Sequence, residues 1–62
     1  MIQKLGKYQK FRRLIKAKEV KENLKGEFKI SYINLVLNPN DKRTNKKIIN
    51  EAIRLIKKKL KD

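Results

Sequence analysis

The stretch FKISYINLVLNPND, residues 28–41, decides how the fold of this chain is interpreted. Apolar and polar residues alternate from Phe28 to Tyr32, which is the period of a half-buried strand. Beyond Ile33 the apolar residues occupy both parities, so such a strand would be buried on both faces or would contain a bulge. Pro39 lies in the turn that follows and prevents the ladder from continuing. The content of Tyr, Ile and Val therefore favours a strand over residues 28–37.

A lone strand leaves its backbone donors and acceptors unpaired, and even a two-stranded hairpin is marginal in water. We therefore predict a small α+β domain, ordered helix–strand–helix, in which the strands of residues 28–37 from two chains pair antiparallel across a two-fold homodimer. The alternative is a three-helix bundle, because Ile30, Ile33 and Leu37 also have helical spacing.

The segments on either side are predicted to be helices. Apolar residues recur at three- and four-residue spacings in the first, predicting a helix over residues 7–25 that bends near Ala17 and stops at Gly26. The second has a broad apolar face and is predicted to run over residues 44–61, with an N-cap at Asp41 or Thr44. The whole chain, residues 1–62, is predicted to be one domain.

Charge and composition narrow the function. The 62 residues include 19 Lys and Arg against 6 Asp and Glu, giving a net charge of +13. A polyanion would relieve the resulting self-repulsion, and nucleic acid is the first candidate. There is no Cys and no His, which removes the commonest metal ligands and general base. We therefore predict a protein that is not an enzyme, with no cofactor, metal or small-molecule substrate. The absence of a signal peptide and of a membrane-spanning run predicts a cytoplasmic protein without a membrane partner, in a host cytoplasm if it is viral.

Three basic groups are candidate nucleic-acid contacts. The first interleaves cations with Tyr8 and Phe11, which either stack on bases or pack in the core. The second surrounds the start of the C-terminal helix, where a phosphate would offset four cations that oppose the helix dipole. The third, residues 57–61, is a helix end that adds general attraction. If the strand forms a dimer ribbon, its polar side adds Lys29 and Ser31, with Asn34, as residues that can face a groove. The candidate residues are Lys7, Lys10, Arg12, Arg13, Lys29, Ser31, Lys42, Arg43, Lys46 and Lys47.

The segment RTNKKIINEAIRLIKKKL, residues 43–60, resembles the second helix of ribbon–helix–helix repressors. The resemblance implies a paired two-stranded ribbon that enters the major groove of DNA. That family has a helix between its strand and its second helix, whereas only NPNDK stands at that place in this chain.

These observations predict a small double-stranded-DNA-binding regulator or architectural protein that acts as a dimer through phosphate contacts, with DNA favoured over RNA. One alternative is a ribosomal or other RNA-bound structural protein. Another is an inhibitor or adaptor that docks on an acidic protein surface.

Overall fold

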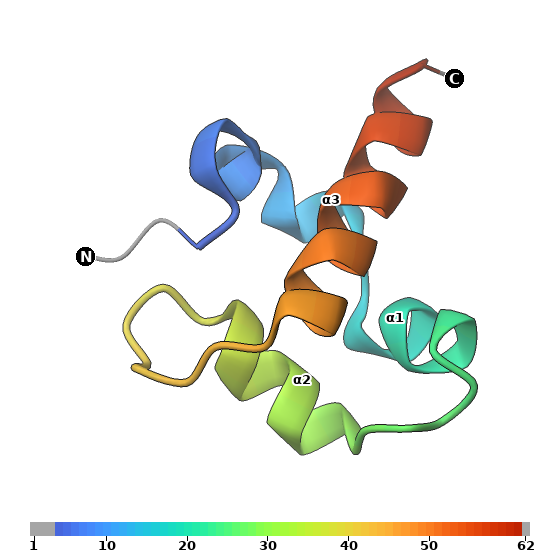
Figure 1. Ribbon diagram of the computed structural model, residues 1–62. Coiled ribbons are helices and arrows are strands. Elements are labelled where there is room, and N and C mark those ends of the chain that lie inside the picture. Colours follow the sequence, from blue (N-terminus) through green and yellow to red (C-terminus); the bar gives the residue numbers. More distant parts are fainter. Residues whose placement is uncertain (1–3, 62) are drawn as a thin grey trace.

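The computed structural model describes residues 4–61, and these residues form a bundle of four helical segments (Figure 1). No strand occurs within this range, so the predicted α+β fold is wrong. The segments are the 3₁₀ helix η1 (Gly6–Leu14) and the α-helices α1 (Ala17–Asn23), α2 (Ile30–Leu37) and α3 (Lys46–Lys61).

Helix α2 occupies the segment for which a strand is predicted. Ile33, Val36 and Leu37 are each at most 1% exposed. A strand would place Ile33 and Val36 on opposite faces, whereas positions three and four apart share one face of a helix. One helical face therefore buries all three residues inside a single chain. Residues 4–61 therefore contain no strand that could form the ribbon implied by the repressor resemblance or pair between two copies.

The predicted first helix is interrupted at Ile15 and Lys16. Both residues have extended backbone, with φ −121° and ψ 154° at Ile15 and φ −114° and ψ 146° at Lys16. In one straight helix Ile15 and Val20 would point to different sides, since five residues turn a helix by about 500°. The interruption lets both side chains enter the core, where they are 2% and 0% exposed.

Helix α1 ends in a Schellman motif that brings the chain round into α2. The N–H of Gly26 donates to the carbonyl of Lys21 (2.8 Å), and the N–H of Lys25 donates to that of Glu22 (3.0 Å). This pattern places Lys25 at C′, with φ +59°, and Gly26 at the next position, with φ +73°. The residue immediately after the helix cap is therefore Lys25 and not Gly26 as predicted.

Helix α3 begins close to the predicted residue, but its N-cap is different. The side-chain Oδ1 of Asn45 accepts from the N–H groups of Lys47 (3.0 Å) and Ile48 (3.3 Å). Asp41 instead accepts from the N–H of Arg43 (2.8 Å) within the preceding loop. The predicted caps, Asp41 and Thr44, are therefore replaced by Asn45.

One core is shared by α1, α2, α3 and the residues that flank η1, and Tyr8 and Phe11 of η1 pack against it. Its members are small or medium aliphatic side chains, and no charged or polar side chain is buried in the described residues. The core consists of Leu5, Ile15, Ala17, Val20, Ile33, Val36, Leu37, Ile48, Ala52, Leu55 and Ile56. Because α2 packs against both α1 and α3, its outward face is held in a fixed orientation.

Candidate nucleic-acid interface

The outward face of α2 has no charged residue. Ser31 and Asn34 are exposed there, and the apolar side chains of Ile30 and Leu35 are 40% and 36% exposed. The buried face of the same helix fixes this arrangement, because Ile33, Val36 and Leu37 all point into the core. The result is a short helix that presents one hydroxyl, one amide and two aliphatic groups to solvent.

Basic side chains from the N-terminal part of the chain reach this helix. The Nη1 of Arg12 donates to the carbonyl of Ile15 (2.7 Å), and its Nη2 donates to Oδ1 of Asn34 (3.4 Å). Burial of this guanidinium lowers the pKa of Arg12. The Nζ of Lys4 donates to the carbonyl of Leu35 (3.3 Å) and to that of Arg43. Cations therefore lie along the half of α2 that carries Asn34 and Leu35.

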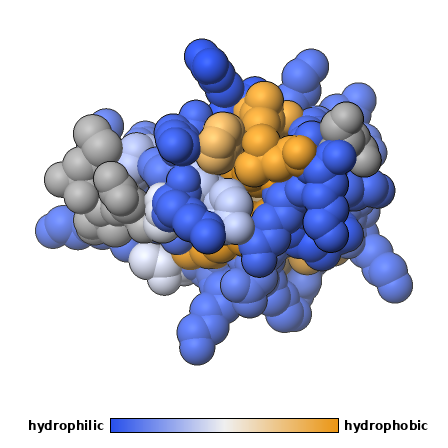
Figure 2. Space-filling view, turned by 90° about the horizontal axis from the view of Figure 1, so that it is seen from above, coloured by the Kyte–Doolittle hydropathy of each residue, from blue (hydrophilic) through white to orange (hydrophobic). Residues whose placement is uncertain are grey.

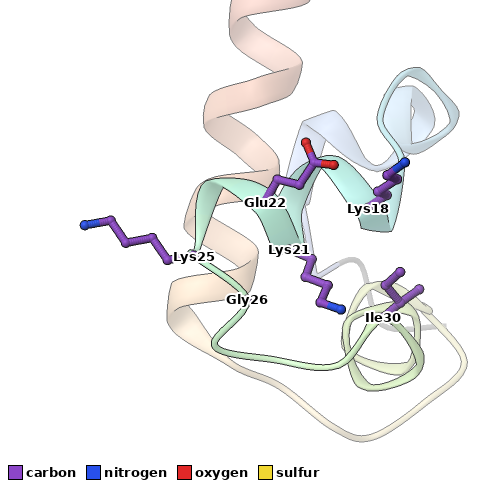
Figure 3. Close-up of a pocket in the computed structure, with 6 residues that line it drawn as sticks. All are labelled: Lys18, Lys21, Glu22, Lys25, Gly26 and Ile30. Atoms are coloured by element: carbon purple, nitrogen blue, oxygen red, sulfur yellow. The ribbon is translucent and has the colours of Figure 1, made fainter.

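A hollow of about 450 Å³ lies between α1 and the start of α2 (Figure 3). Lys21 extends from α1 toward α2 in this view, whereas Lys25 points away from it. The hollow is lined by Lys18, Lys21, Glu22, Lys25, Gly26 and Ile30. The beginning of α2 is therefore also bordered by cations, in this case from α1.

The four basic residues predicted as contacts in η1 have different surroundings in the structure. Arg12 is half-buried and donates to Ile15 and Asn34, while Arg13 is exposed. Nζ of Lys7 lies 5.4 Å from the ring centroid of Tyr8, and Nζ of Lys10 lies 5.2 Å from that of Phe11. Both rings are partly buried against the core. The two rings were predicted either to stack on bases or to pack in the core, and in the structure they pack against the core.

Half of the predicted group before and at the start of α3 is engaged within the chain. Arg43 forms an ion pair with Asp41 (2.9 Å), and Lys47 forms one with Glu27 (3.1 Å). The backbone donors at the start of the helix are capped by Asn45. Lys42 and Lys46 are exposed. Asp41 and Glu27 therefore neutralise two of the four cations whose opposition to the helix dipole a bound phosphate was predicted to offset.

The residues predicted to face a groove from the polar side of the strand are brought together by the fold. Lys29 is the N-cap residue of α2, and Ser31 and Asn34 lie on its exposed face. In a regular strand Ser31 and Asn34 would lie on opposite faces unless a bulge changed the alternation. On a helix, residues three apart are neighbours on the same face.

The structure adds four cations that were not predicted to be site residues. Lys18, Lys21 and Lys25 line the hollow beside Ile30, and Lys4 reaches the carbonyl of Leu35. The spacing of Lys18 and Lys21, at i and i+3, is that of one helical face and was available as a signal, whereas Lys25 follows the end of α1. Lys4 could not have been found in this way, because its contact depends on the tertiary fold.

Hydrophilic side chains cover most of the molecular surface in the view toward the C-terminal end of α3, where an apolar area is surrounded by them (Figure 2). Outside α2, the exposed large apolar residues among residues 4–61 are Leu14 and Leu60. Across the same residues, no helix combines the length and apolarity needed to span a membrane, and no group of three or more acidic side chains could hold a metal ion. Comparisons with protein-family models, curated proteins and solved structures gave no match to this chain.

Proposed function

We propose that this chain is a non-enzymatic protein that binds double-stranded DNA, with α1 and α2 forming a helix–turn–helix unit and α2 lying in the major groove. One observation carries the proposal. The uncharged outer face of α2, made by Ile30, Ser31, Asn34 and Leu35, is bordered by cations near both ends of the helix.

The dimensions and support of α2 suit a groove. An α-helix with its side chains is about 10–12 Å in diameter, which matches the major-groove width of about 12 Å, and the eight residues of α2 give it a length of about 12 Å. In a helix–turn–helix unit the second helix enters the groove while the first crosses the DNA backbone. Here α1 packs against the inner side of α2, and the Schellman turn at Lys25 fixes how one helix follows the other.

The distribution of charge suggests that the lysines around α2 contact phosphates and that its uncharged polar groups contact bases. Lysine is a point-charge ligand for phosphate and does not carry sequence information there. Lys18 and Lys21 lie on α1, and Lys29 lies at the start of α2. With α2 in the major groove, these lysines would lie close to the DNA phosphates that border the groove. Hydroxyl and amide groups such as those of Ser31 and Asn34 form hydrogen bonds with base edges.

The same geometry favours DNA over RNA. The major groove of A-form RNA is deep and too narrow for side chains to read the bases. A helix that presents base-reading groups therefore suits B-form DNA. Binding to RNA therefore ranks below binding to DNA, and titration against both duplexes compares the two directly.

The test is fluorescence-anisotropy titration against matched duplex DNA and duplex RNA at about 50 and 200 mM salt, since phosphate contacts make binding salt-dependent. We expect tighter binding to DNA. Asn34→Glu should weaken that binding by about tenfold or more, because it removes a base contact and places a negative charge in the groove.

Asn50→Glu is the matched control. Asn50 is exposed on α3, so the substitution makes the same change in net charge away from α2, and its effect should be small because of screening. Equal losses for the two variants would contradict the placement of α2 in the groove. Preference for duplex RNA, or no binding to either duplex at the lower salt concentration, would overturn the proposed function.

A further inference from the structure

The exposed face of α2 has a composition that selects among base pairs. We propose that α2 recognises A·T base pairs, with Ile30 and Leu35 packing on thymine methyl groups and Asn34 pairing with adenine. This inference rests on the proposed function and specifies which DNA that site takes.

Part of the exposed face of α2 is apolar. Ile30 and Leu35 keep 40% and 36% of their surface exposed, in a chain that otherwise presents many lysines to solvent. Thymine is the base that offers a methyl group, at C5, in the major groove, and apolar side chains contact it there. Two aliphatic groups on a helix in the groove therefore have a specific apolar partner on A·T pairs.

Helix α2 lacks the residue types that usually read G·C pairs. Guanine is most often read by a bidentate Arg or Lys, and cytosine by an acidic acceptor. The sequence of α2, ISYINLVL, contains none of these residues. Arg43 and Arg54 are paired with Asp41 and Glu51, and the guanidinium of Arg12 is engaged by the carbonyl of Ile15 and by Oδ1 of Asn34. The helix therefore carries none of the charged side chains that most often read guanine or cytosine.

The orientation of the Asn34 amide is suited to adenine. Asparagine reads adenine by accepting from N6 and donating to N7. Because Nη2 of Arg12 donates to Oδ1 of Asn34 (3.4 Å), this oxygen lies on the side of Arg12 and leaves Nδ2 as the donor. An amide oxygen has two lone pairs, so Oδ1 can accept from adenine as well. Arg12 acts here as a positioning residue for the amide.

The experiment begins with selection of binding sites from random duplexes, followed by titration of one selected site of about two helical turns. Three forms of that duplex are compared: the thymine form, the same duplex with deoxyuridine in place of thymine, and a form with G·C pairs at the selected A·T positions. Deoxyuridine removes only the C5 methyl. We expect selection of A·T pairs and about tenfold weaker binding to the deoxyuridine form, from the loss of two buried methyl contacts.

The double variant Ile30→Ala/Leu35→Ala should bind the thymine and deoxyuridine forms equally. Leu14→Ala/Leu60→Ala is the matched control, because these two leucines are as exposed, at 38% and 48%, and lie on η1 and α3. The control should keep the preference for thymine. Circular dichroism of both double variants checks that they fold.

The outcomes separate this inference from the proposed function. Binding to DNA that does not distinguish thymine from deoxyuridine would overturn the methyl contact, even with a preference for A·T pairs, since minor-groove width alone can produce that preference. Selection of G·C pairs would overturn it as well. Failure to bind duplex DNA in any form would overturn the proposed function itself.

Discussion

At the scale of single residues, Lys25 stores backbone strain at the turn between α1 and α2. Its φ of +59° lies in the left-handed region, which costs a residue with a Cβ about 1–2 kcal/mol. Lys25→Gly removes that strain but adds disorder to the unfolded chain. We expect a net gain of about 0.5–1 kcal/mol in the free energy of unfolding, measured by urea titration with circular dichroism.

Two further substitutions separate strain from charge at this turn. Lys25→Ala removes the charge but keeps a Cβ at positive φ, so it should not reproduce the gain. Gly26→Ala should destabilise the protein by about 1 kcal/mol through its backbone alone, because Gly26 has φ +73° and an added methyl group would meet no neighbouring atom within 4 Å. An equal gain from Lys25→Ala would show that charge repulsion, and not backbone strain, limits stability here.

At the scale of elements, the start of α3 distinguishes the observed cap from the predicted ones. Asn45 caps the helix through two backbone donors, so Asn45→Ala should cost about 1 kcal/mol. Thr44 was one of the predicted caps and is exposed, so Thr44→Ala should leave stability nearly unchanged. The measurement is again the free energy of unfolding in urea. A larger loss for Thr44→Ala than for Asn45→Ala would contradict the capping arrangement.

The elements also show which parts of the fold are predictable from sequence. Helix α3 follows from its broad apolar face alone, since Ile48, Ala52, Leu55 and Ile56 are all buried. Helix α2 does not, because β-branched and aromatic residues favour a strand locally, whereas the observed helix depends on burial of Ile33 against other elements. The apolar residues on both parities of this segment were the signal that a helical period fitted better.

The candidate site was predicted in part, for the same reason. Lys29, Ser31 and Asn34 were expected to face a groove from a strand, and the structure places them at the start and on the exposed face of α2. Their residue types indicated that they could contact DNA. That they share one end and one face of an element could be predicted only with the helical period in place of the strand period. Ile30 and Leu35 were missed because an apolar residue in a sequence is first assigned to the core, and its exposure becomes known only from packing.

At the scale of the whole molecule, few carboxylates offset a large positive charge. Four of the five acidic residues within residues 4–61 form ion pairs with Lys or Arg: Glu19, Glu27, Asp41 and Glu51. Two of these pairs join distant segments, because Glu19 on α1 pairs with Lys59 on α3 (2.9 Å), and Glu27 in the turn pairs with Lys47 on α3 (3.1 Å). Hydrogen bonds from Arg43 and Arg54 lower the pKa values of Asp41 and Glu51. Protonation of these two carboxylates at low pH removes internal partners while the net charge rises, so the fold should be sensitive to acid.

Glu51 is the carboxylate for which this acid sensitivity has a specific structural cause. Hydrogen bonds from Arg54 lower the pKa of Glu51 despite its partial burial, and Nδ2 of Asn23 on α1 donates to the same carboxylate (3.1 Å). A lowered pKa in the folded state means that the stabilisation is fully present above the unfolded value, about 4.3. It is lost as the pH falls through the folded value.

Glu51→Gln should therefore lower the Tm at pH 7 and have a smaller effect at about pH 2, where the native carboxyl is also neutral. The measurement is a series of thermal unfolding curves across this pH range. Glu22→Gln is the control, since it removes the same charge from an exposed position on α1. A constant difference in Tm between wild type and Glu51→Gln at all pH values would mean that the substitution acts through packing. In that case ionisation of Glu51 would not account for the acid sensitivity of the fold.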